Sequence, residues 1–158
     1  LATKKYVDDN AGGSSVQYYY ETKITNYYAS ATTIYIPLAG YILERTYTSS
    51  SNEYLGFIAP YNGVLEKALW RSEIAHDGTL TFEILEAADG TEIPSTSLGS
   101  KATVIDIADD ISQDISFSSM SAGSNVLTKG RVYIVKITSP SASQDTNVTT
   151  VWKWDITT

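Results

Sequence analysis

The sequence VWKWDI, at residues 151–156, alternates large apolar residues with charged ones. Successive side chains of a strand point to opposite faces of a sheet, so Trp152, Trp154 and Ile156 would share one face. Large aromatic rings on such a face normally belong to a protein core. The segment is therefore predicted to be a core strand in which Trp152 and Trp154 are buried.

The same alternation recurs along the chain. In TLTFEIL, at residues 79–85, Leu80, Phe82 and Ile84 share one face and the polar residues share the other. Other runs rich in β-branched and aromatic residues are also predicted to be strands. These runs are residues 16–24, 33–38, 41–47, 53–60, 64–70, 103–107 and 131–137.

Turn-forming residues separate these runs. The Asn-Gly pair at residues 62–63 suits the positive φ angles of tight hairpins, so we predict a hairpin between the strands at 53–60 and 64–70. The His-Asp-Gly sequence at 76–78 and the Asp-Gly pair at 89–90 predict two further turns.

The order of these segments predicts the fold class. Roughly eight to ten strands follow one another with no long helical pattern between them, which indicates an all-β domain. We expect an antiparallel β-sandwich, jelly-roll-like, over residues 16–158. An up-and-down barrel also fits, because the order of strands along the chain does not determine how they pair.

The first 15 residues have a different pattern. In LATKKYVDDN, residues 1–10, Thr3 can cap a helical turn and the spacing of Leu1, Tyr6 and Val7 is roughly helical. Glycine and serine at residues 12–15 end the pattern. A helix this short is marginal alone in water, so Leu1, Tyr6 and Val7 are predicted to form a helical neck that contacts other subunits.

A tyrosine-rich segment follows this neck. Tyr18, Tyr19, Tyr20, Tyr27 and Tyr28 lie within eleven residues. The segment is interpreted first as a sheet face or a contact with a neighbouring subunit, since tyrosine fits a half-buried pleated surface. The alternative is an aromatic platform for a sugar or another ligand.

Composition limits the classes of partner. The chain has 158 residues, enough for one core, and its 11 basic and 18 acidic residues give a net charge of -7. An acidic chain without a basic patch argues against nucleic-acid binding. It has no cysteine and no run of about 20 apolar residues, so neither thiolate chemistry nor membrane insertion is expected. The chain begins at Leu1 without a signal-peptide pattern, which suggests a fragment of a longer protein.

Motifs for catalysis are missing from the sequence. A catalytic triad would need His76, the only histidine, but this residue precedes a predicted turn and no Gly-x-Ser-x-Gly motif is present. There is no phosphate-binding loop, and the acidic residues Asp109, Asp110 and Asp114 lack the spacing of a calcium loop. Paired carboxylates for a glycosidase are available, but the sequence cannot show that two of them converge. We therefore expect no enzymatic activity, no cofactor and no metal.

Two segments resemble known virion proteins. ATKKYVDDN, at residues 2–10, resembles the Ala-Thr-Lys-x-Tyr-Val-Asp-Asp segment of tail fibres and other virion structural proteins of tailed phages, where it commonly precedes a β-rich domain. FIAPYNGVLEKALWRSE, at residues 57–73, is similar to a segment of phage virion proteins, especially those of marine phages. The resemblance implies a homotrimer whose short helices form a neck carrying three β-domains, without a conserved catalytic set.

The resemblance leads to three hypotheses. The first is a tail-fibre tip at the virion surface that contacts other virion proteins and binds a glycan or protein on the host surface. The second is a purely structural virion component, such as a head fibre or capsid decoration protein. The third is a polysaccharide depolymerase, which the lack of a repeated β-helix pattern disfavours.

Overall fold

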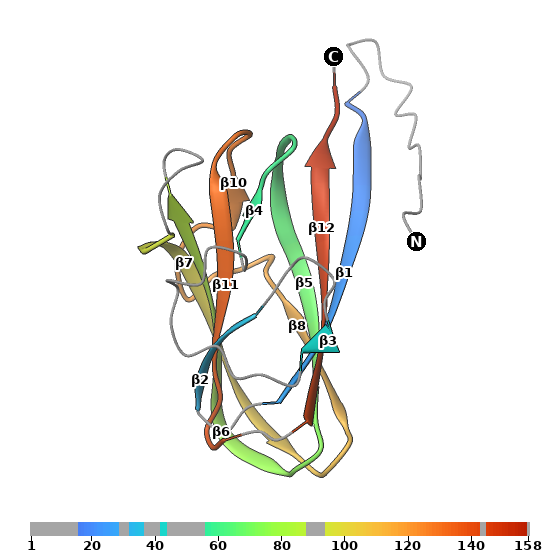
Figure 1. The fold of residues 1–158 in the computed structure, drawn as a ribbon, viewed down its shortest axis with the longest axis vertical. Coiled ribbons are helices and arrows are strands. Elements are labelled where there is room, and N and C mark those ends of the chain that lie inside the picture. The colour runs from blue at the N-terminus through green and yellow to red at the C-terminus, as the bar shows by residue number, and fades with distance from the viewer. Residues whose placement is uncertain are drawn as a thin grey trace.

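The computed structural model describes residues 16–28, 32–36, 42–43, 56–87, 94–142 and 145–157, and within these ranges it contains twelve strands and no helix. The predicted all-β class is thus confirmed for this part of the chain (Figure 1). The predicted helical neck at 1–15 lies outside the described residues. The strands are β1 (Tyr18–Tyr28), β2 (Thr33–Ile36), β3 (Ile42–Leu43), β4 (Phe57–Ile58), β5 (Asn62–Ser72), β6 (His76–Ala87), β7 (Thr96–Ile107), β8 (Ser112–Ser116), β9 (Ala122–Gly123), β10 (Val126–Leu127), β11 (Val132–Thr138) and β12 (Asp145–Asp155).

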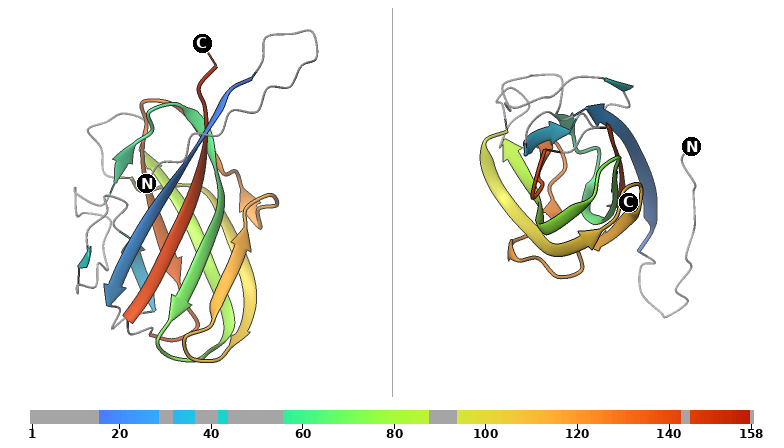
Figure 2. Two further views of the ribbon diagram at one scale, coloured as in Figure 1. Left: turned by 90° about the vertical axis from the view of Figure 1, so that its right-hand side faces the viewer. Right: turned by 90° about the horizontal axis from the view of Figure 1, so that it is seen from below.

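The strands form two six-stranded sheets. The first has the order β10-β5-β12-β1-β3 with β8 also beside β5, and the second has the order β2-β11-β6-β7-β9 with β4 also beside β11. Every pairing between described strands is antiparallel except the short parallel pairing of β1 with β3. Figure 2 shows the first sheet face-on at the left, and at the right both sheets curving around the interior.

The core between the sheets contains residues from both. Trp152 and Trp154 are both 0% exposed, which confirms their predicted burial. Their rings stack with centroids 6.0 Å apart, and Phe57 meets Trp152 edge-on at 4.9 Å. Trp154 Nε1 donates a hydrogen bond to Glu21 Oε2 at 2.9 Å, because a buried indole N–H needs an acceptor. Leu80 and the other apolar residues of its predicted face on β6 are equally buried.

Most predicted strands are present with shifted ends. Residues 64–70, 79–85, 103–107 and 151–156 lie wholly or almost wholly in β5, β6, β7 and β12, and residues 131–137 match β11 within one residue. Of the predicted strand at 33–38, Thr33–Ile36 is β2 and the last two residues are not described, and only Ile42–Leu43 of 41–47 is a described strand. Residues 53–60 contribute only the two residues of β4 to the described strands.

The predicted hairpin at residues 62–63 is wrong. Asn62 and Gly63 are the first residues of β5, while β4 pairs with β11 in the other sheet. A Cβ atom on Gly63 would lie 2.5 Å from both the Lys153 carbonyl oxygen and the Trp154 ring. Glycine is therefore needed here for close packing against β12 rather than for a turn.

The predicted turn at residues 76–78 is also wrong. His76 and Gly78 are part of β6, where they pair with Ile107 and Ile105 of β7. The chain bends instead at residues 73–75, on its way from β5 in the first sheet to β6 in the second. Gly78 has a φ of 129°, which explains why a turn-forming residue stands inside a strand. The predicted turn at 89–90 lies in a segment that is not described.

The two ends of the fold differ. At the lower end of Figure 1 the chain passes between the sheets from β5 to β6 and from β7 to β8. At the upper end β1 begins and β12 finishes. There Gln17 and Thr157 are neighbours, because the Gln17 N–H donates to Thr157 Oγ1 at 3.1 Å and the Ile156 N–H donates to the Gln17 carbonyl at 2.9 Å.

Candidate functional site

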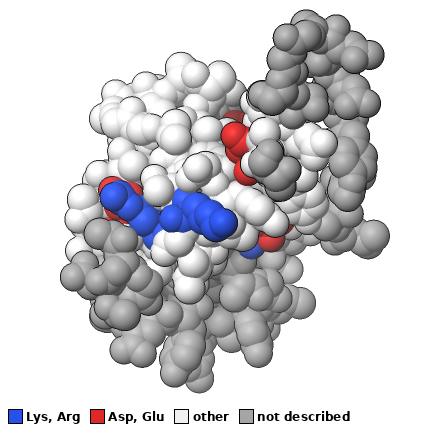
Figure 3. All heavy atoms as spheres, turned by 90° about the horizontal axis from the view of Figure 1, so that it is seen from above, with Lys and Arg blue, Asp and Glu red and all other residues white. Residues whose placement is uncertain are grey.

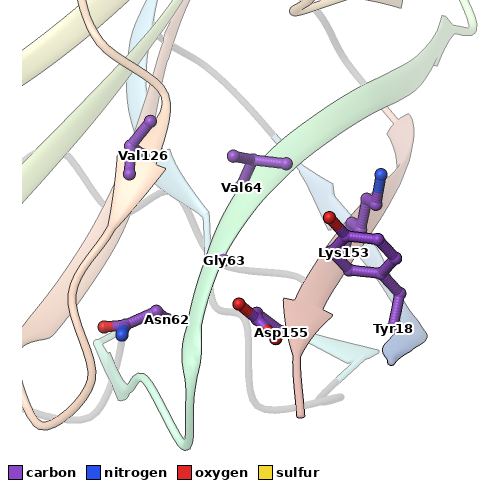
Figure 4. Close-up of a pocket in the computed structure, with 7 residues that line it drawn as sticks. All are labelled: Tyr18, Asn62, Gly63, Val64, Val126, Lys153 and Asp155. Carbon is purple, nitrogen blue, oxygen red and sulfur yellow. The ribbon is translucent and has the colours of Figure 1, made fainter. Parts of the chain in front are cut away.

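A groove opens on the outer face of the first sheet, at its upper end (Figure 4). It has a volume of about 260 Å³ and takes side chains from β1, β5, β10 and β12. The residues that line it are Tyr18, Asn62, Gly63, Val64, Val126, Lys153 and Asp155.

Strand register places these residues in two rows. Tyr18 pairs with Asp155, which pairs in turn with Asn62, and these three residues form the row nearest the upper end. Lys153 pairs with Val64, which pairs with Val126, and they form the second row. The Trp154 ring packs beneath Gly63 on the inner side, so the groove rests on the core.

Alternation along β1 separates the tyrosines. Tyr18 and Tyr20 belong to the outer face, whereas Tyr19 packs against the core between the sheets. Lys153 Nζ lies 4.0 Å from the centre of the Tyr18 ring and 6.0 Å from that of Tyr20. The negative face of an aromatic ring attracts a cation, so Tyr18 holds the Lys153 ammonium at the edge of the groove.

A carboxylate and an amide complete the first row. The Thr157 hydroxyl and the Thr157 backbone N–H hydrogen bond to Asp155 and lower the pKa of its carboxyl group, which is therefore charged at neutral pH. Asn62 Oδ1 accepts the Lys129 backbone N–H at 3.0 Å, which orients the amide. The groove thus brings an aromatic ring, a cation, a hydrogen-bond acceptor and an amide to one surface.

The predicted site residues are only partly brought together. Of the five tyrosines, Tyr18 lines the groove and Tyr20 stands beside its lysine. Tyr27 and Tyr28 are the last residues of β1, at the end of the strand farthest from the groove, and their side chains are not described. The predicted subunit contacts Leu1, Tyr6 and Val7 also fall outside the described part of the chain.

Most of the groove could not be predicted from the sequence. The one local indication of the groove was the polar face of VWKWDI, which supplies Lys153 and Asp155. The remaining residues come from β5 and β10, and no local pattern shows that these strands lie beside β12. Strand pairing across the chain creates the site.

His76 lies away from the groove, buried at the start of β6. Its Nε2 is 3.2 Å from Ser72 Oγ and its Nδ1 is 3.0 Å from Ser141 Oγ. The Trp70 ring meets the imidazole edge-on at 4.9 Å. Burial lowers the pKa of His76 below its usual value, so the imidazole is neutral at pH 7. Both hydrogen-bond partners of His76 are serine hydroxyls, and no carboxylate among the described residues binds the imidazole. A Ser-His-acid triad is therefore not assembled from the described residues.

Two of the three acidic residues weighed for calcium have protein partners. Asp110 binds Arg71 at 2.8 Å, and Asp114 lies 3.6 Å from Lys67. Within the described ranges, no group of three or more acidic or histidine side chains is arranged to hold a metal ion. The same ranges contain no helix long and apolar enough to cross a membrane.

Comparisons with known proteins give no family. No protein-family model matches the chain, and no curated protein is significantly similar to it. Among solved structures, an aminopeptidase from the marine sediment archaeon Thaumarchaeota archaeon aligns over 96% of this chain and 34% of its own, with 9% identity and a TM-score of 0.36. The structure of infectious bursal disease virus, Gx strain, aligns over 96% of this chain and 42% of its own, with 9% identity and a TM-score of 0.28. Both scores are too low to establish a shared fold.

Proposed function

We propose that the chain is a non-enzymatic attachment domain of a phage virion fibre that binds a host-surface glycan through the groove on its first sheet. The observation that carries this proposal is the convergence of Tyr18, Lys153, Asp155 and Asn62 on one open surface. The two sequence segments that resemble phage virion proteins supply the biological setting, at the virion surface.

The chemistry of the groove suits a sugar. A sugar ring has an apolar face, which packs against an aromatic ring, and a rim of hydroxyl groups, which need donors and acceptors. Tyr18 offers the ring, Asp155 offers an acceptor and the Asn62 amide offers a donor. Val64 and Val126 add an apolar wall next to these polar groups.

The strand order supports a jelly-roll form of β-sandwich. The eight main strands, in chain order, are β1, β2, β5, β6, β7, β8, β11 and β12. The first and last of them pair (β1 with β12), and the pairing continues inward with β2 and β11, β5 and β8, and β6 and β7. This is the pattern of one long hairpin rolled into two sheets, an architecture used by viral capsid and lectin domains. Fold does not determine function, so the groove carries the proposal rather than the architecture.

A structural role in the virion is the second candidate. The outer face of the first sheet also exposes Ile24 by 62% and Val126 by 56%. Exposed apolar residues on the same face as Tyr18 and Tyr20 would suit a contact between copies of the chain or with another virion protein. In this alternative the tyrosines serve assembly rather than ligand binding.

Glycan-array binding by the purified chain, residues 1–158, tests both candidates. We expect binding to a limited set of glycans, lowered at least tenfold by Tyr18→Ala and unchanged by Ile24→Ala, which truncates an exposed residue on the same face of β1 outside the groove. Binding that survives Tyr18→Ala would contradict the proposed site. A parent chain that binds no glycan, and in which Ile24→Ala lowers the oligomer mass, would support the structural role instead.

A further inference from the structure

The described basic residues fall into two groups. Most have a partner, either a carboxylate or, for Lys101, the Ser119 carbonyl at 2.8 Å. The ion pairs are Lys23–Glu21, Lys67–Asp114, Arg71–Asp110, Arg131–Glu86 and Lys136–Glu83. Within the described ranges, only the ammonium groups of Lys129 and Lys153 have neither an ion pair nor a hydrogen bond.

These two lysines share one environment. Lys153 lies over the Tyr18 ring at 4.0 Å, and Lys129 lies over the Tyr61 ring at 5.9 Å. Both belong to the upper end of the fold, since the Lys129 backbone N–H binds Asn62 of the first row and Lys153 lines the groove. Figure 3 views this end and shows a short row of basic side chains among described residues that are mostly uncharged, with acidic side chains beside it. Each ammonium is thus held by a ring and keeps its N–H groups available to a ligand.

The first row of the groove joins Lys129 to the Tyr18 ring, over which the Lys153 ammonium lies. The Lys129 backbone N–H binds the Asn62 side chain, Asn62 pairs with Asp155, and Asp155 pairs with Tyr18. Neighbouring strands lie about 4.8 Å apart, so the step from Asn62 to Tyr18 alone covers about 10 Å. Lys129 and Tyr61 extend the row further, which makes it longer than one sugar ring.

On the basis of the proposed glycan function, we propose that the ligand is an acidic oligosaccharide that lies along this row, with one acidic group on Lys153 and another on Lys129. The charges alternate along the row: Lys129 is positive, Asp155 is negative and the Lys153 ammonium is positive. Asp155 repels an anion but accepts hydrogen bonds from hydroxyl groups. The ligand would therefore carry its carboxylate or sulfate groups at two separated points, with hydroxyl groups between them.

The net charge of the whole chain limits where an acidic ligand can bind. A net charge of -7 repels an acidic polymer at long range, so binding one requires cations placed at short range. Lysines already engaged in ion pairs would have to give up a carboxylate to bind a new anion. Lys129 and Lys153 lose no such partner, and the tyrosine rings limit the side-chain freedom that binding would remove.

Calorimetry on the 1–158 chain with four probes tests the proposal. The probes are oligogalacturonate, the same oligomer with its carboxyl groups reduced, dextran sulfate oligomers and neutral dextran oligomers. We expect at least fivefold tighter binding of an acidic probe than of its neutral counterpart, and the probe that is preferred distinguishes carboxylate from sulfate. The preference should weaken with added salt, since it rests on exposed charges.

Substitutions of the two lysines test whether they cause the preference for an acidic probe. Lys153→Gln and Lys129→Gln should each lower affinity for the acidic probe about fivefold, and the double variant should bind the acidic probe no more tightly than its neutral counterpart. Lys153→Arg should retain the preference. Lys67→Gln, which removes a paired lysine from the same sheet, is the matched control and should bind like the parent. Unchanged melting temperatures would show that the variants fold.

The outcomes separate the two proposals. The acidic-ligand proposal is overturned if acidic and neutral probes bind equally, or if the acidic preference survives in the double lysine variant. In either case the proposed glycan groove is still supported if Tyr18→Ala abolishes binding. Failure of the parent chain to bind any of the four probes or any glycan on the array overturns both.

Discussion

At the scale of single residues, neighbours on one strand have opposite roles. Trp154 is buried and hydrogen bonds to Glu21, whereas Lys153, the preceding residue, lies on the outer face over Tyr18. The alternation in VWKWDI was sufficient to predict the buried tryptophans. It could not predict that Lys153 and Asp155 line a groove, because their groove partners come from strands distant in the sequence.

The first prediction concerns the core. Trp154→Ala should lower the free energy of unfolding by about 3–5 kcal/mol, because a large ring is lost from a packed interior. Lys153→Ala, at the adjacent outward position, should lower it by about 1 kcal/mol or less, the size of an exposed contact between a cation and a ring. Urea denaturation followed by far-UV circular dichroism measures both. Equal effects of the two substitutions would contradict the assignment of faces on β12.

The second prediction concerns pH and His76. Burial lowers the pKa of His76 in the folded state, so below its ordinary value of 6.5 the unfolded chain binds more protons than the folded one. Stability contributed by the neutral imidazole is therefore present above pH 6.5 and is lost as the pH falls through the folded pKa. The melting temperature should decrease between pH 7.5 and 5.5.

The assignment to His76 has a direct control, because the chain has only one histidine. His76→Gln keeps a side chain that can hydrogen bond to Ser72 and Ser141 but does not titrate, so it should flatten the pH dependence over this range. A slope that persists in His76→Gln would assign the effect to other groups. We also expect His76→Ala to leave glycan binding and any hydrolytic activity unchanged, since His76 is remote from the groove.

At the scale of elements, strands were easier to predict than connections. Period-two alternation is a local property, so segments such as β6 and β12 could be identified from their own residues. Which sheet a strand joins depends on pairing across the whole chain. The Asn-Gly pair at 62–63 therefore suggested a hairpin, while the actual partner of β4 is β11.

The third prediction tests this revised role of Gly63. Gly63→Ala should destabilise the protein by about 1–3 kcal/mol, because the new Cβ has no space against Lys153 and Trp154. Gly130→Asn is the control, since Gly130 has nothing within 4 Å and asparagine tolerates its φ of 85°. It should change stability by less than about 1 kcal/mol. A Gly63→Ala protein as stable as the parent would show that β5 and β12 are not so closely packed.

At the scale of the whole molecule, assembly is the main remaining prediction. We expect the chain to form a homotrimer in which Leu1, Tyr6 and Val7 meet on an axis and bury surfaces that a short helix cannot bury alone. Three chains of charge -7 repel one another, so these contacts should be apolar. Light scattering should give a trimer mass, and Val7→Asp should give a monomer. A parent chain that is monomeric would contradict the trimer.

The neighbouring positions of Gln17 and Thr157 have a mechanical consequence. Strands β1 and β12 are antiparallel over eleven residue pairs, and the pair nearest these two ends is Tyr18 with Asp155. Tension that separates Gln17 from Thr157 acts along the hydrogen bonds between the strands, which run perpendicular to them, and opens the pairs one at a time from that end. The first pair to open belongs to the groove, so such a force would release a bound ligand before it reached the tryptophan core.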